Sequence, residues 1–410
     1  MPSKKTDVTV QLVKYQKKEL ELKALLEITQ AINENKSAAV LFDIFKFTCL
    51  VHLNIKSILL YMSNHDHFEK KISHGIKSKV PDAILSEKIN FDKASGELNI
   101  EVGEGFSFAE LENYLPVFHK EKMLAILFRK KKDEKEDLDL DFTQALTNIM
   151  VVALENKRFA KRQLEQERLN KEMEIASNVQ RMLFPAVLPQ TDKLKAKVTY
   201  IPHSTVGGDY YDLIQKSEEE VFFCIADVSG KGMPAALLMS NFQAALRTLL
   251  RSSSDLKMIV EQLNYTIFDN TKGERFITFF LGYYNYKKRE LTYVNAGHNP
   301  PVLCWEGEKR TETLGAGTTV LGAFEQLPFL EVGKRIHLKG FTLHLYTDGL
   351  TESFDKNEKE YGDDRFNQFV KSHLCLDPSV FHQLFFEELR IFSTGGEQRD
   401  DITLLSLRLQ

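Results

Sequence analysis

Cysteine is scarce in this chain of 410 residues: Cys49, Cys224, Cys304 and Cys375 are widely separated, and none forms a Cys-x-x-Cys pair. This spacing excludes a typical zinc site and a disulfide framework, and it favours a reducing compartment, the cytoplasm. Long apolar runs are also missing, since none approaches the roughly 18 residues that a membrane span needs. The sequence therefore predicts neither a membrane segment nor a membrane partner.

An excess of charge of one sign is absent too, because 54 basic and 58 acidic residues give a formal net charge of −4. A chain so balanced has no bulk attraction for nucleic acid, and we expect no nucleic-acid partner. The 43% of hydrophobic residues is ordinary for a globular protein. At roughly 150 residues per domain, the length predicts two or three domains.

Glycine is rare in the first half of the chain. Only Gly75, Gly96, Gly103 and Gly105 precede residue 207, whereas the rest of the 21 glycines follow it. Glycine marks turns and close approaches of the backbone, so the two halves are expected to differ in architecture.

The first half has an α+β pattern. Apolar residues at helical spacing predict helices over about 10–35 and 38–53, and short apolar runs predict strands near 56–62, 68–72, 88–91, 98–102 and 122–128. From Asp141 to Phe184 there is neither glycine nor proline, which predicts one long helix that ends at Pro185. Its densely charged part, 157–174, has apolar residues only at intervals: Phe159, Leu164, Leu169 and Met173. This pattern is compatible with a parallel coiled-coil dimer or with a solvated monomeric linker.

The second half has short apolar strands between glycine-rich turns. Strands are predicted at 221–226, 278–284, 291–294, 341–346 and 402–408, and amphipathic helices at 234–250 and 256–270. We expect an α/β sandwich with sheets inside and helices outside.

Four aspartates in this half stand at predicted strand ends beside glycine: Asp209, Asp227, Asp348 and Asp400. One such aspartate is usually a turn residue. Four of them point instead to a site for a hard divalent cation, Mg²⁺ or Mn²⁺, because converging carboxylates would otherwise repel one another. Two such ions would lower the pKa of a shared water and supply hydroxide for attack on phosphorus.

The motifs that contain these aspartates resemble those of a known family. Gly207-Gly-Asp-Tyr-Tyr-Asp212, Asp227-Val-Ser-Gly-Lys-Gly232, Asn295-Ala-Gly-His-Asn-Pro300, Tyr346-Thr-Asp-Gly349 and Asp400-Asp-Ile-Thr403 follow the order found in the SpoIIE-like, RsbU-like branch of the metal-dependent protein phosphatase 2C superfamily. The segment Ile175–Pro189 is similar to the helix and proline pair that leads into its catalytic domain. The resemblance implies an αββα sandwich and hydrolysis of phosphoserine or phosphothreonine.

The resemblance also implies roles for individual residues. Asp227 would bridge two Mn²⁺ or Mg²⁺ ions, Asp209 and the Val228 carbonyl would complete one ion, and Asp348 and Asp400 would bind the other. Lys231 would orient the phosphate as a point charge. Three further polar residues are weaker candidates for the metal site. Asp401 is expected beside the ligands and not among them, and Asp212 is a candidate only because it is close to Asp209 in the sequence. His298 is expected to be a structural turn residue. The general acid stays open.

The helix–strand layout of the first half resembles a GAF sensory domain. We therefore expect an N-terminal helical extension at 1–19, a GAF-like domain at 20–155, a helical linker at 156–185 and the phosphatase domain at 186–410. The GAF-like domain would bind an unknown small ligand or only mediate dimerisation, and the linker would join a homodimer.

By resemblance, the substrate would be a phosphorylated STAS-type anti-anti-sigma factor. The alternative is a catalytically silent partner-switching binding module, but the four aspartates argue against it. A two-metal nuclease would need a basic surface, which the charge balance does not predict.

Overall fold

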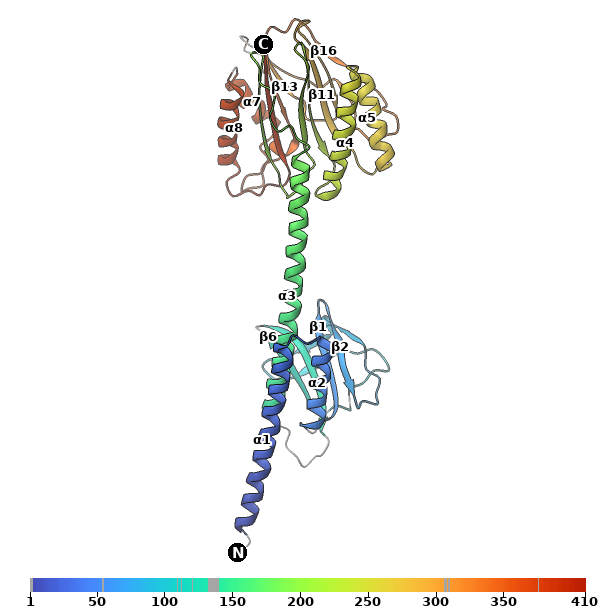
Figure 1. Ribbon diagram of the computed structural model, residues 1–410, viewed down its shortest axis with the longest axis vertical. Helices are drawn as coiled ribbons and strands as arrows, with labels where there is room; N and C mark the ends of the chain where they lie inside the picture. The colour runs from blue at the N-terminus through green and yellow to red at the C-terminus, as the bar shows by residue number, and fades with distance from the viewer. Residues whose placement is uncertain are drawn as a thin grey trace. The chain divides into compact units, whose positions relative to one another are not determined.

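The protein was studied as a computed structural model, which describes residues 3–53, 55–108, 110–111, 113–119, 121–131, 140–305, 308, 310–374 and 376–410. The chain forms two compact units, Met1–Glu167 and Arg168–Gln410 (Figure 1). The boundary falls within the segment 156–185 that was predicted to be a linker. Cys375 lies outside the described residues, and the other three cysteines are buried free thiols.

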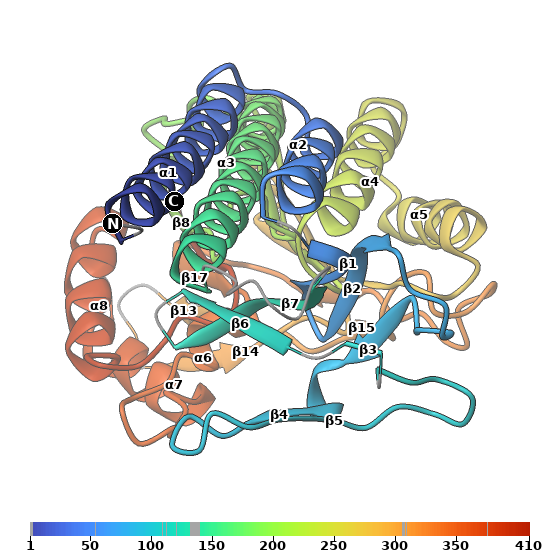
Figure 2. The ribbon, with the colours of Figure 1, turned by 90° about the horizontal axis from the view of Figure 1, so that it is seen from below.

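The N-terminal unit is a five-stranded antiparallel sheet covered on one face by helices (Figure 2). The helices are α1 (Ser3–Asn33), α2 (Ala38–Val51) and the first part of α3 (Leu140–Arg181). The strand order is β3 (Ala83–Leu85), β2 (His67–His74), β1 (Ile55–Asn64), β7 (Lys122–Lys131) and β6 (Asn113–His119). A short 3-10 helix, η1 (Ser86–Lys88), precedes a separate hairpin of β4 (Ile89–Phe91) and β5 (Leu98–Ile100).

Apolar residues from these helices and strands form the core of the N-terminal unit. Ile28 of α1, Phe45 of α2 and Leu146 of α3 pack on Ile58 and Leu127 of the sheet. Ser37 begins α2, and its hydroxyl accepts a hydrogen bond from the Val40 amide at 3.4 Å. The layout agrees with the expected order of helices and strands, while the assignment to the GAF fold stays a prediction.

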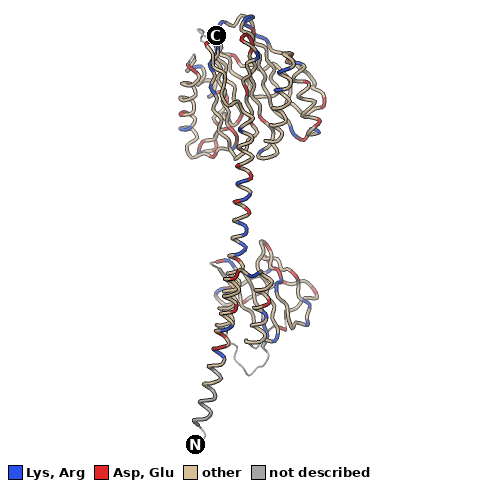
Figure 3. Tube along the Cα trace, in the orientation of Figure 1, with Lys and Arg blue, Asp and Glu red and all other residues tan. Residues whose placement is uncertain are grey.

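Helix α3 is continuous from Leu140 to Arg181, as the absence of glycine and proline predicted. Acidic and basic residues are interspersed along its part from Glu155 to Glu174 (Figure 3). The apolar side chains within this charged stretch are exposed in the single chain: Phe159 by 66%, Leu164 by 68% and Leu169 by 51%. None of the helices in the described parts of the chain is both long and apolar enough to cross a bilayer.

The C-terminal unit contains two stacked sheets. One sheet has the order β15 (Gly317–Thr318), β12 (Glu290–Ala296), β11 (Ile277–Asn285), β10 (Glu220–Val228) and β9 (Tyr210–Ser217), and β16 (Gly333–Arg335) pairs with β12. The other has the order β14 (Thr311–Thr313), β13 (Val302–Trp305), β17 (Phe341–Tyr346), β18 (Ile402–Leu409) and β8 (Leu194–Ile201).

Helices cover both outer faces of this pair of sheets (Figure 1). Helices α4 (Met233–Ser252) and α5 (Leu256–Thr271) pack on the β9–β15 sheet, where Phe242 and Leu263 meet Phe222 and Phe279. Helices α7 (Asp363–Ser372) and α8 (Pro378–Phe392) pack on the other sheet. A third apolar core, with Phe223 and Leu343 among its members, fills the space between the sheets. The predicted αββα order is confirmed for this unit.

Candidate metal centre

The strand pairing of the C-terminal unit places the four predicted aspartates at meeting strand ends. Asp209 immediately precedes β9, and Asp227 lies at the end of β10. The two strands are antiparallel, and Ala226 of β10 lies opposite Tyr210 of β9. Asp348 begins the short helix α6 (Asp348–Thr351) just after β17, and Asp400 precedes β18, the antiparallel partner of β17. Antiparallel neighbours bring the end of one strand beside the start of the next, so each pair of strands contributes one pair of aspartates.

Two threonines from the second sheet hold Asp209. Its carboxylate is only 1% exposed, and Oδ2 accepts hydrogen bonds from Thr347 Oγ1 at 2.9 Å and from Thr403 Oγ1. The Thr403 amide donates to Thr347 Oγ1 at 2.9 Å, which fixes that hydroxyl in turn. These bonds connect Asp209 of one sheet to the residues that precede Asp348 and follow Asp400. Sequence reasoning assigned no role to either threonine.

Asp401 binds the backbone of the loop that carries Asp209. Its Oδ1 accepts from the His203 amide at 2.7 Å, and its Oδ2 accepts from the Gly208 amide at 2.9 Å. Both carboxylate oxygens are thus used to position backbone, in keeping with the expected place beside the ligands.

Burial and mutual repulsion raise the pKa values of three of the aspartates. Burial, followed by the charges of Asp348 and Asp400, raises the pKa of Asp227 to about 8. Burial and then the charge of Asp227 raise the pKa of Asp209 well above its ordinary value. Burial and then Asp400 raise the pKa of Asp348. Such crowding is what a bound cation relieves.

Lys231 is a positively charged residue that forms an ion pair with one of the four aspartates. Its Nζ lies 2.7 Å from Asp400 Oδ2 and also donates to the Arg399 carbonyl. The lysine sits between Gly230 and Gly232, both with positive φ, just before α4 begins. The structure therefore pairs Lys231 with a predicted metal ligand, and its contact with phosphate stays a prediction.

The donor set fits hard divalent cations that keep several waters. Within the described residues, no three His, Cys, Asp or Glu side chains form a ready-made ligand set for a metal ion. Mg²⁺ is commonly held by one or two carboxylates and completes its shell with water, so a closed protein cage is not required. A Cβ added at Gly208 would lie 2.9 Å from the Val228 carbonyl oxygen and 3.3 Å from Asp227 Oδ1. The absent side chain thus leaves room beside two of the predicted ligand atoms.

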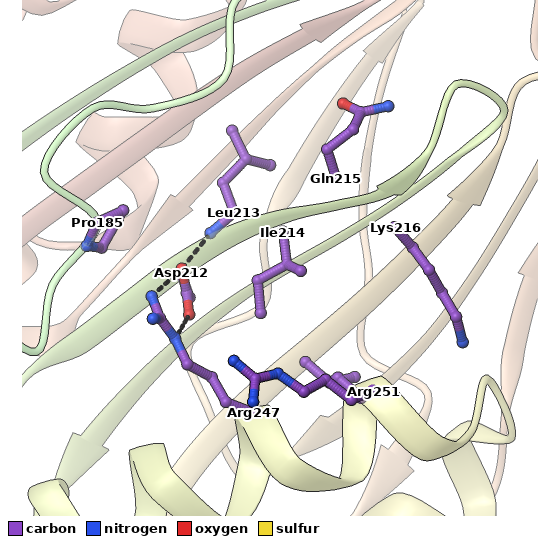
Figure 4. A pocket seen from close by; sticks show the side chains of 9 residues that line it. Pro185, Asp212, Leu213, Ile214, Gln215, Lys216, Arg247 and Arg251 are labelled. Atoms are coloured by element: carbon purple, nitrogen blue, oxygen red, sulfur yellow. Dashed lines mark hydrogen bonds and ion pairs between the residues drawn. The ribbon is translucent and has the colours of Figure 1, made fainter.

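Asp212 and His298 have structural roles. Asp212 is buried and accepts bonds from Arg247 Nε at 2.8 Å, Arg247 Nη2 at 3.2 Å and Tyr210 Oη at 2.6 Å. This ion pair joins β9 to α4 beside a cavity of about 570 Å³ (Figure 4). Burial lowers the pKa of His298 to about 4, and the turn is closed because the His298 amide donates to Asn295 Oδ1 at 2.8 Å. The expectation of a turn role for His298 agrees with this geometry.

Comparisons with known proteins agree with the fold of the C-terminal unit. The sequence pattern of the family described as stage II sporulation protein E (SpoIIE) matches residues 217–410. Phosphoserine phosphatase RsbU of Bacillus subtilis (strain 168) is 30% identical over 243 residues, which cover 59% of this chain and 71% of RsbU. Protein IcfG of Synechocystis sp. is 26% identical over 263 residues, which cover 58% of this chain and 41% of IcfG.

The solved PP2C domain of SiaA from Pseudomonas aeruginosa shares the fold, with a TM-score of 0.53 and 21% identity over 60% of this chain and 99% of that domain. The αββα fold with its crowded aspartates defines the class of PP2C-type phosphatases. Within that class the chain belongs to the SpoIIE family of RsbU-like proteins, and it is accordingly an enzyme of the protein-serine/threonine phosphatase type.

Proposed function

We propose that this protein uses Mn²⁺ or Mg²⁺ to hydrolyse phosphoserine or phosphothreonine in a protein substrate. The observation that carries the proposal is the group of Asp209, Asp227, Asp348 and Asp400 at meeting strand ends of a PP2C fold, where burial and repulsion raise the pKa values of three of them. When bound, two such ions supply a hydroxide nucleophile by lowering the pKa of a water that they share.

The chain's own residues have distinct parts in this proposal. Asp227 would contact both ions, Asp209 and the Val228 carbonyl would hold one, and Asp348 and Asp400 would hold the other. Thr347 and Thr403 keep the Asp209 carboxylate in place, and Asp401 keeps the Gly208 backbone in place. Lys231, next to Asp400, would contact the phosphate as a point charge.

The substrate that we propose is a phosphorylated STAS-type anti-anti-sigma factor. Support comes from the 30% identity with RsbU, whose name states that it is a phosphoserine phosphatase. A silent partner-switching module is the alternative, but nothing in the geometry favours it, because all four aspartates are present and brought together.

The test is release of phosphate from a phosphoserine STAS-domain protein and from p-nitrophenyl phosphate by the full chain, with Mn²⁺ and with a chelator. We expect release with Mn²⁺, none with the chelator, and recovery when Mn²⁺ is added back. Equal rates with the metal and with the chelator would refute the metal-dependent mechanism. Binding of the phosphoprotein without release at any metal concentration would favour the silent module.

We also propose that α3 joins two copies of the chain and passes the state of the N-terminal GAF-like domain, ligand-bound or not, to the phosphatase domain. The support for a contact between copies is that Phe159, Leu164 and Leu169 are exposed in the single chain and would be covered in a coiled coil.

The double substitution Leu164→Glu and Leu169→Glu is expected to convert a dimer into a monomer, because it places four carboxylates in the proposed contact. Light scattering of the full chain measures the mass directly. The matched control, Leu164→Met with Leu169→Met, changes the same two positions but keeps their apolar surface and should leave the mass unchanged. A wild-type chain that is already monomeric would contradict this part of the proposal.

A further inference from the structure

The side chain of Gln180 makes a two-point contact with the loop that carries Asp209. Gln180 lies in the last turn of α3 and is only 7% exposed. Its Nε2 donates to the Gly207 carbonyl at 2.8 Å, and the Gly207 amide donates to its Oε1 at 3.2 Å. One side-chain amide therefore satisfies both backbone groups of a residue that is two positions before Asp209. We name this pair of bonds the Gln180 clamp.

The clamped loop has little freedom to move. A Cβ at Gly207 would lie 2.1 Å from Asp401 Oδ2 and 2.2 Å from Tyr200 Oη, so these groups enclose the Gly207 backbone on the side where a side chain would stand. The next residue, Gly208, donates its amide to Asp401 and faces the Val228 carbonyl and Asp227. A shift of Gly207 would therefore be passed to Gly208, which lies beside Val228 and Asp227, and to the predicted ligand Asp209.

The other side of the clamp is also fixed. Just beyond α3, the ring of Phe184 packs on Tyr200, Tyr210 and Tyr211 at centroid distances of 5.4, 5.8 and 5.0 Å. Gln243 of α4 donates to the Leu183 carbonyl at 3.2 Å. The segment that follows α3 is thus packed against the C-terminal unit, and these contacts also hold the last turn of α3, which carries Gln180, in position.

We propose that Gln180 is a positioning residue for the metal centre: its clamp holds the Gly207–Asp209 loop in the arrangement that accepts the metal, so metal affinity depends on the last turn of α3. This inference rests on the proposed function. The amide suits the task because it both donates and accepts, whereas a carboxylate of the same shape would face the Gly207 carbonyl with a second acceptor. Without the two bonds to Gln180, the buried amide and carbonyl of Gly207 would have no hydrogen-bond partner. The loop would then favour a conformation in which these groups are hydrogen-bonded again.

The chain contains a matched control for this contact. Gln190 makes the same two bonds with Ala196 in β8: its Nε2 donates to the Ala196 carbonyl at 2.6 Å, and the Ala196 amide donates to its Oε1 at 3.1 Å. These two bonds involve neither the Gly207–Asp209 loop nor any of the four aspartates. Replacing either glutamine by methionine removes two hydrogen bonds and keeps the side-chain length.

The experiment compares the full-length wild type, Gln180→Met and Gln190→Met by calorimetric titration of the metal-free proteins with Mn²⁺. We expect Gln180→Met to bind Mn²⁺ about tenfold more weakly, the equivalent of losing one to two hydrogen bonds, while Gln190→Met stays within about twofold of the wild type. Because Gln180 is buried and Gln190 is exposed, melting curves of the metal-free proteins should show the smaller loss in Gln190→Met. If Gln180→Met folds poorly, Gln180→Glu, which keeps the acceptor and loses the donor, is expected to weaken Mn²⁺ binding in the same direction.

Unchanged Mn²⁺ affinity in the folded Gln180 variant would overturn the inference, as would an equal loss in both glutamine variants. Failure of the proposed function is recognised separately, because the wild type itself would then bind no Mn²⁺ or show no metal-dependent release of phosphate.

Discussion

Replacing Asp227 by asparagine is expected to lower Mn²⁺-dependent release of phosphate by on the order of 10³-fold, which corresponds to about 4 kcal/mol of lost transition-state stabilisation. The charges of both Asp348 and Asp400 raise the pKa of Asp227, and the charge of Asp227 in turn raises the pKa of Asp209. It is therefore the residue that connects the two pairs of aspartates. An amide in its place keeps the shape and removes the charge that would hold both ions.

Steady-state rates at saturating Mn²⁺, together with melting curves with and without Mn²⁺, measure this effect. Because the substitution removes one of several crowded carboxylates, the metal-free variant should melt no lower than the metal-free wild type, and the rise in melting temperature caused by Mn²⁺ should be lost. Asp192→Asn, an exposed aspartate before β8, is the control and should behave like the wild type. Full activity in Asp227→Asn would refute the assigned role.

The second large effect is expected from Gly208→Ala. The added Cβ would lie 2.9 Å from the Val228 carbonyl oxygen, a backbone atom that cannot move without shifting the end of β10. Gly208 does not belong to the glycines with positive φ, so the cost of the substitution arises from space rather than from backbone conformation. We expect Mn²⁺ affinity to fall at least about tenfold. Such a fall needs the displaced ligand atoms to weaken the binding free energy by only roughly 1.4 kcal/mol.

Titration of the metal-free protein with Mn²⁺ measures this loss, and Gly315→Ala is its control. A Cβ at Gly315 would meet nothing within 4 Å, and Gly315 also lacks a positive φ, so that variant should match the wild type. If Gly208→Ala bound Mn²⁺ as tightly as Gly315→Ala, the space beside Val228 and Asp227 would have no part in metal binding.

Asp209, Asp227 and Asp348 could be predicted from sequence because each combines a predicted strand end with a glycine within three residues, whereas Asp400 is marked only by the strand that follows it. Antiparallel pairing then brings the strand ends together, so the gathering of Asp209 with Asp227 and of Asp348 with Asp400 follows from topology. The roles of Thr347, Thr403 and Gln180 could not be predicted in this way. Their partners are remote in the chain, and a threonine or glutamine carries no local pattern that identifies such a partner.

Several elements of the fold were not predicted, and the reasons are local. Strand β6 contains Pro116, which removes a ladder donor and is tolerated because β6 is the edge strand beside β7. Helix α8 begins after Asp377 with Pro378 at its first position, and the Asp377 side chain accepts from the Ser379 amide. The Asp-Pro pair is a start signal that the sequence itself contains. Strand β8 mixes polar and apolar residues because one of its faces enters the core between the sheets. Strand β9 is buried on both faces near its start, with Tyr210 packed against α4 and Tyr211 between the sheets, and only its later residues are exposed.

The central claim is that these aspartates bind the metal that drives phosphate hydrolysis. Direct titration of the metal-free full chain with Mn²⁺, in the wild type and in Asp348→Asn, tests it most directly. The account predicts that the wild type binds Mn²⁺ and that Asp348→Asn loses binding to at least one site while it remains folded. Identical Mn²⁺ binding in the two proteins would contradict the account.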